Sequence, residues 1–168
     1  MLVYLGLAGC GIAHLHLPRL LNLNFLNLSG NRLIGFAARQ LKPVEHHRTL
    51  SLAANPLVRL FALDRSPTSS SAHALSQLDL SRDTMGTLNL RGLAFLANLH
   101  NLNFSGNGVQ RVLGARFSSF PKLQTLFLRG CPFTADFSYT ACFLLLRVLL
   151  PRFLFKLRVL SNRRKVWK

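Results

Sequence analysis

The chain has 168 residues, 49% of them hydrophobic, which fits one ordinary domain with an apolar core and argues against disorder. Lys and Arg number 21 against 5 Asp and Glu, and residues 139–168 hold eight of the basic residues and none of the acidic ones. The three cysteines, Cys10, Cys131 and Cys142, are too few and too scattered for a disulfide framework or a Cys-x-x-Cys zinc site.

One apolar pattern, L-x-x-L-x-L-x-x-N/C-x-L, recurs along the chain at intervals of about two dozen residues. The third copy is degraded, because the polar His47 occupies its first apolar position. The six copies span residues 2–12, 23–33, 47–57, 75–85, 99–109 and 123–133. Six copies in one register indicate a stack of repeated coils, in which each coil buries its apolar side chains against its neighbours.

The L-x-L core of each copy predicts a short strand, whose alternation directs the leucines inward and the intervening residue outward. Neighbouring strands then pair as one parallel sheet. The predicted fold is of the α/β class, a curved single-sheet solenoid over residues 1–138, followed by a basic apolar tail, helical or irregular, over residues 139–168. Strands are expected at residues 5–7, 26–28, 50–52, 78–80, 102–104 and 126–128.

The ninth position of the pattern follows the strand, where the chain bends and leaves backbone donors and acceptors to be satisfied. Asn31, Asn55 and Asn107 are interpreted as a ladder of side chains that bond these groups. Cys10 and Cys131 are interpreted as small substitutes in the same ladder, with a structural rather than a metal or redox role. The segment from Leu7 to Cys10 also resembles the box before a lipidated bacterial cysteine, but no Lys or Arg precedes it.

Two interruptions are expected. Residues 65–71, rich in Ser and Pro, predict a surface loop between the third and fourth copies. The first copy begins at Leu2 with nothing upstream to cover it, although solenoids need terminal caps, so we expect a truncated amino end.

The tail leaves three interpretations open. Residues 143–160 are apolar enough for a membrane span, but their four basic residues and a proline argue against it. A basic amphipathic segment on an anionic membrane surface is a second interpretation. The third is a sequence that selection never shaped, from a shifted reading frame or a degraded gene copy.

Several features resemble one family. Apolar pairs precede two strands, at Leu96 with Leu99 and at Phe117 with Phe120, and residues 131–137, CPFTADF, resemble a cysteine-rich cap that has lost its cysteines. With the repeat, these features resemble the typical class of extracellular leucine-rich repeat proteins, Toll-like receptor ectodomains among them. The resemblance covers residues 2–138 and implies extracellular or membrane-associated ligand recognition, in this chain by a fragment or diverged copy of such a receptor.

The function predicted is recognition of a protein ligand or co-receptor by the concave face of the sheet. Large or charged side chains are expected to anchor it, since aromatic residues and arginines dominate interfaces. These are Tyr4, Phe25, Arg48, Asp79, Arg82, His100, Phe127 and Arg129. Asn27 and Asn103 begin N-glycosylation sequons, which suits secretion but also arises from the repeat itself.

Polyanion binding and catalysis are two alternative functions. The charge of +16 suggests nucleic-acid or polyanion binding, but only Arg48, Arg82 and Arg129 fall on the concave strands. Catalysis is not expected, because the acidic residues are spread out and no Gly-rich phosphate loop occurs. His46 and His47 would point to opposite sides of a strand, so they would not act together in one catalytic or metal site. No metal or cofactor is expected.

Overall fold

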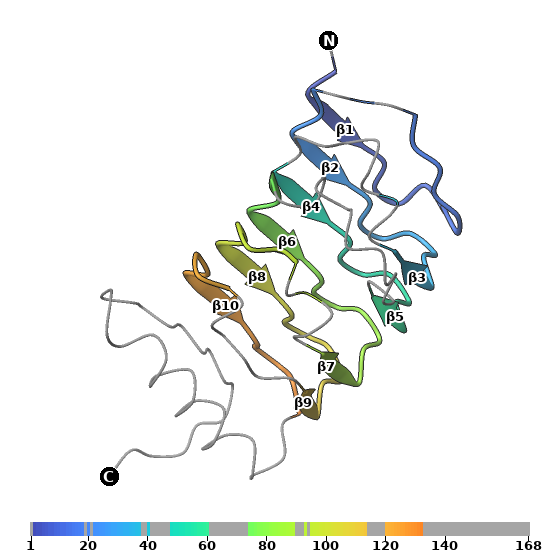
Figure 1. Ribbon diagram of the computed structural model, residues 1–168. Coiled ribbons are helices and arrows are strands. Elements are labelled where there is room, and N and C mark those ends of the chain that lie inside the picture. The colour runs from blue at the N-terminus through green and yellow to red at the C-terminus, as the bar shows by residue number, and fades with distance from the viewer. Residues whose placement is uncertain are drawn as a thin grey trace, which may run out of the picture.

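The computed structural model describes residues 2–18, 20, 22–37, 40, 48–60, 74–89, 93, 95–113 and 120–132. In these residues the chain makes one coil per sequence copy, and each coil contributes a short strand to a common sheet (Figure 1). We number the coils one to six in chain order. Their strands are β1 (Tyr4–Gly6), β2 (Phe25–Asn27), β4 (Thr49–Ser51), β6 (Gln77–Asp79), β8 (Asn101–Asn103) and β10 (Thr125–Phe127).

All neighbouring strands of this sheet are parallel, in the order β1-β2-β4-β6-β8-β10. The register places one leucine of each coil opposite the next, as in Leu26, Leu50 and Leu78. The predicted solenoid and its single parallel sheet are therefore confirmed. Each strand is centred one residue earlier than expected, because the chain already turns after the third strand residue.

Leucines fill the interior between the sheet and the rest of each coil. The central strand leucines of coils two to six are at most 2% exposed, and Leu96, Leu99 and Phe120 are buried as well. The apolar positions before the strands therefore do pack inward. In coil one, Leu5 and Leu7 are only partly buried against this core.

Two additional strand pairs lie on the other side of the coils (Figure 1). β3 (Gly35–Phe36) pairs with β5 (Arg59–Leu60), and β7 (Thr87–Asn89) pairs with β9 (Arg111–Leu113), both in parallel. The sequence analysis did not predict them. They form because coils two and three, and coils four and five, continue in register beyond the turn, where Phe36 and Leu88 are 2% exposed.

The ladder of ninth-position side chains joins successive coils. The side-chain Nδ2 of Asn31 donates to the carbonyl oxygens of Leu7 (2.7 Å) and Leu28 (2.8 Å), so it bonds the preceding coil and its own. Asn107 does the same, to Leu80 at 2.6 Å and Phe104 at 2.9 Å. These bonds confirm the interpretation of the ninth-position asparagines as a structural ladder, and they fix the spacing of the coils.

Several sequence-based expectations lie outside the described residues. They concern His47, the loop at residues 65–71, Phe117, Cys142 and the whole tail at residues 139–168. In the part of the chain that the structure does describe, no helix has the length and apolar character needed to cross a membrane.

Candidate recognition surface

The six-stranded sheet has one face against the core and one turned away from it, which we call the open face. On the open face lie the first and third residues of each strand, because side chains alternate along a strand. The first residues form one row across the sheet: Tyr4, Phe25, Thr49, Gln77, Asn101 and Thr125. The third residues form a second row: Gly6, Asn27, Ser51, Asp79, Asn103 and Phe127.

An aromatic pair occupies the β1–β2 end of the open face. The rings of Tyr4 and Phe25 stack with centroids 4.7 Å apart and planes inclined by 10°. A Cβ atom on Gly6 would lie 3.0 Å from Tyr4 Cε1, so the Tyr4 ring covers the backbone at Gly6. Tyr4 is 57% exposed. The pair therefore forms a flat apolar platform that solvent or a partner can reach.

The middle of the open face is polar and mostly uncharged. Asn27, Asp79 and Asn103 each accept a hydrogen bond through Oδ1 from the backbone amide two residues later, at 3.0 Å. These bonds close the turn that ends each strand. Ser29 Oγ also donates to Asn27 Oδ1 at 2.7 Å. Both sequon asparagines therefore lie on the open face, with their side-chain oxygens engaged by the turn.

Basic side chains lie near both ends of the strands. Arg48 and His100 each directly precede a strand; Arg48 is exposed, and His100 Nδ1 is 2.7 Å from the carbonyl oxygen of Asn98. Arg82 and Arg129 follow their strands, past the carboxyl ends, and both are exposed. Arg82 has a φ of 60°, a backbone conformation that residues other than glycine seldom adopt.

The structure thus distributes the eight predicted recognition residues over three regions. Tyr4, Phe25, Asp79 and Phe127 lie in strands on the open face. Arg48 and His100 lie before the amino ends of their strands, and Arg82 and Arg129 lie past the carboxyl ends. The sequence analysis named only large or charged side chains. It missed the smaller polar members of the two rows, such as Gln77 and Asn101, which the same repeat register could have identified.

Asp83 interrupts the ladder in coil four. Its Oδ1 accepts from the backbone amide of Asn55 at 2.7 Å, but its Oδ2 is buried and has no hydrogen-bond partner among the described residues. Burial raises the pKa of this carboxyl from 3.8 to about 7; the Asn55 amide lowers it and the charge of Asp79 raises it further. Asn31, at the same position, has an amide that donates two bonds, which an ionised carboxylate cannot do.

The stability of the solenoid should therefore depend on the charge of Asp83. Between about pH 4 and pH 7 the folded carboxyl holds a proton that the unfolded one has lost, so the free energy of unfolding falls as pH rises. We expect the free energy of unfolding of Asp83→Asn, relative to that of wild type, to rise by about 2–4 kcal/mol across this pH range. Urea unfolding at several pH values measures it.

A matched substitution separates the causes of this dependence. Asp79→Asn should keep most of the wild-type slope, because burial is the largest cause of the raised pKa at Asp83 and the charge of Asp79 is a smaller one. If Asp83→Asn retained the wild-type slope, another group would be responsible.

The two described cysteines, Cys10 and Cys131, each lie near a backbone carbonyl oxygen. Cys131 Sγ lies 3.3 Å from the carbonyl oxygen of Phe104, as a ladder side chain would, and burial raises the pKa of its thiol. Cys10 is exposed, with Sγ 3.5 Å from the carbonyl oxygen of Ala8. Within these described residues no group of three or more His, Cys, Asp or Glu side chains could hold a metal ion.

Comparisons with known proteins give structural neighbours only. No protein-family model and no curated protein matches the sequence. A chain of the TLR13–ssRNA13 complex is 20% identical over 71% of this chain, with a TM-score of 0.47. A chain of the LRIM1/APL1C complex is 22% identical over 67%, with a TM-score of 0.38, and a Leptospira interrogans LRR protein is 22% identical over 74%, with a TM-score of 0.40.

This chain spans 20%, 30% and 41% of the lengths of those three chains, respectively. Sequence identities of 20–22% and TM-scores below 0.5 carry no argument about the function of this chain. The assignment of the fold depends on this chain's own repeat, its parallel in-register sheet and its asparagine ladder. Together these features make the chain a leucine-rich-repeat solenoid.

Proposed function

We propose that the chain is a non-catalytic recognition module that binds a protein ligand on the open face of its sheet. The observation that carries this proposal is the composition of that face. A stacked aromatic platform lies at one end, and half-buried polar side chains that can hydrogen-bond a partner lie beside it. Rigid aromatic anchors surrounded by polar groups are typical of protein interfaces.

The rigidity of the face supports the proposal further. Each strand is bonded to its neighbours in register and each coil is tied to the next by the ladder, so side chains on the open face are held at fixed spacing. Strand-to-strand spacing of about 4.8 Å suits an extended surface of this kind. A partner that binds such a face loses little free energy in ordering it.

The receptor role in immunity and the extracellular location belong to the same proposal. They rest on the resemblance of residues 2–138 to extracellular repeat proteins. A glycan on Asn27 or Asn103 would cover the open face. Recognition there therefore requires both asparagines to be unmodified in the binding-competent protein.

Peptide selection tests the proposal. We expect a display library of random peptides of about twelve residues to yield binders whose affinity falls by about tenfold or more in Tyr4→Ala, since truncated anchors typically cost that much. Fluorescence polarisation of a selected peptide measures the change.

Ile34→Ala is the matched control. Ile34 is an apolar side chain with 62% exposure beside β3, and its carbonyl oxygen accepts from the amide of Val58, on the other side of the coil from the open face. The control should bind selected peptides as wild type does. Loss of binding in Ile34→Ala with none in Tyr4→Ala would place recognition on the opposite side.

A further inference from the structure

Arg82 occupies a position that glycine holds in most coils. The residue directly before the ladder position has a positive φ in all six coils: Gly9, Gly30, Ala54, Arg82, Gly106 and Gly130. A large side chain at such a backbone angle is strained. Among these six residues Arg82 alone carries a charge, and it extends from a turn at the edge of the open face.

Arg82 and Arg129 lie on either side of one glycine. A Cβ atom on Gly106 would be 3.3 Å from Arg82 Cγ, so the arginine stem of coil four lies against the backbone of coil five. The Gly106 amide donates to the carbonyl oxygen of Arg129 in coil six at 2.7 Å. Two exposed arginines from coils four and six therefore flank Gly106.

The two guanidinium groups have no acidic partner among the described residues. The described acidic side chains are Asp79 and Asp83, and Asp83 is buried in the ladder with its raised pKa. The Asp79 Oδ1 accepts from the Ser81 amide, and no ion pair joins Asp79 to either arginine. Among the residues that the structure describes, no acidic side chain therefore pairs with the positive charges around Gly106.

We propose that Arg82 and Arg129 bind the carboxylates of an acidic segment in the protein partner. This inference rests on the proposed function, because it names the chemistry of the partner at the same face. Charge complementarity supports it: the planar guanidinium presents a fork of donors that matches a carboxylate and is less strongly hydrated than an ammonium group.

The arrangement favours a protein segment over a nucleic acid. Asp79 lies on the open face in β6, the strand that leads into Arg82, so a partner with a negative charge at every unit along the sheet would also meet this carboxylate. A polypeptide can place carboxylates at the arginine pair and a neutral apolar side chain at the platform, whereas a nucleic acid carries a charge at every nucleotide.

Defined peptides test the inference on the full chain. The probe is a fluorescein-labelled peptide of about ten residues, with three consecutive glutamates near one end and a leucine about six residues away. We expect it to bind about tenfold more tightly than the same peptide with glutamines. Arg82→Glu with Arg129→Glu should remove this preference and favour a lysine version instead.

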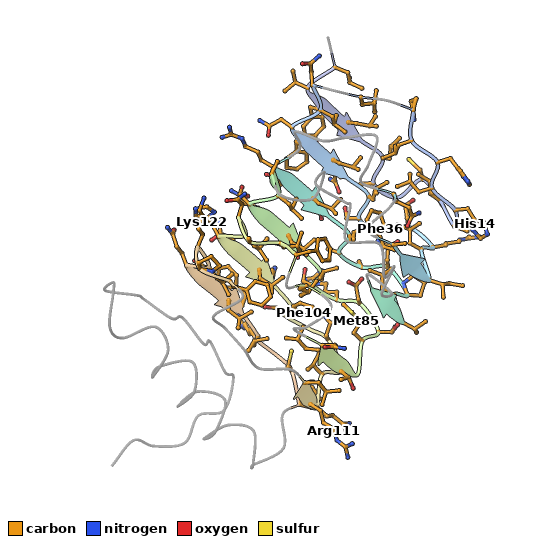
Figure 2. The ribbon with its side chains drawn as sticks, in the orientation of Figure 1. His14, Phe36, Met85, Phe104, Arg111 and Lys122 are labelled. Atoms are coloured by element: carbon orange, nitrogen blue, oxygen red, sulfur yellow. The ribbon has the colours of Figure 1, made fainter. Side chains whose placement is uncertain are left out.

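Two further variants make the result specific. Arg111→Glu makes the charge change of one of these substitutions at exposed Arg111 in β9, which points away from the six-stranded sheet, and should keep the glutamate preference (Figure 2). Arg82→Gly should raise the urea midpoint, by removing backbone strain, while it weakens binding of the glutamate peptide. If the strained backbone at Arg82 is tolerated because the side chain binds the partner, Arg82→Gly shows both the higher urea midpoint and the weaker binding.

Other outcomes would overturn the inference. Equal binding of the glutamate and glutamine peptides, with both weakened by Tyr4→Ala, would refute the arginine site but leave recognition by the open face intact. Binding of neither peptide, together with failure of the library selection, would refute both. Tighter binding of a single-stranded oligothymidylate, weakened equally by Arg82→Glu and Arg111→Glu, would identify a general polyanion binder.

Discussion

Leu102→Ala is expected to lower the free energy of unfolding by about 2–5 kcal/mol. Leu102 is fully buried at the centre of β8, where it lies between Leu78 and Leu126 of the neighbouring coils. Truncation leaves a cavity that both neighbours border, and the closely spaced coils cannot collapse into it without losing sheet bonds. Urea unfolding followed by circular dichroism measures the change.

Arg111→Ala is the control for this variant. Arg111 is exposed in β9, so its truncation should change stability by less than about 0.5 kcal/mol. Equal unfolding midpoints for the Leu102 and Arg111 variants would contradict the register of the coils.

Asn55→Ala is expected to cost about 3–5 kcal/mol, because one side chain satisfies several buried backbone groups. The Nδ2 of Asn55 donates to the carbonyl oxygens of Leu28 (3.0 Å) and Leu52 (2.7 Å), and its Oδ1 accepts from the Leu33 amide at 3.1 Å. Asn55 is 2% exposed, so water cannot replace these bonds without entering the core.

Asn55→Cys provides a graded comparison at the same position. Its thiol can donate one bond, as Cys131 does to Phe104, so this variant should lose less stability than Asn55→Ala. Asn101→Ala, on the open face, should have little effect. Thermal unfolding of the three variants ranks them, and an Asn55→Ala midpoint equal to that of Asn101→Ala would refute the ladder.

The repeat pattern predicted the sheet well because one physical requirement recurs in every coil. A leucine that must be buried at each central strand position, such as Leu50 or Leu78, sets both the register and the parallel pairing. The strand pairs β3–β5 and β7–β9 were missed because the pattern was followed only to the second residue after the ladder position. An apolar residue recurs five residues after that position in all four strands: Phe36, Leu60, Leu88 and Val112.

The electrostatics of the ladder could be predicted only in part. The spacing placed Asp83 at a ladder position, but its missing partner at Oδ2 depends on which backbone groups face it in the folded coil. Arg82 and Arg129 were both predicted as recognition residues, but their common position beside Gly106 was not. It depends on the packing of Arg82 against Gly106 and on the bond from the Gly106 amide to the carbonyl oxygen of Arg129.

Site-specific photo-crosslinking tests the central claim, recognition by the open face, most directly. Benzoylphenylalanine would replace Asn101 in β8, in the first row of the open face, or Ile34, on the other side of the coil. A peptide selected from the library should crosslink at position 101 and not at position 34. Crosslinking at position 34 alone would contradict it.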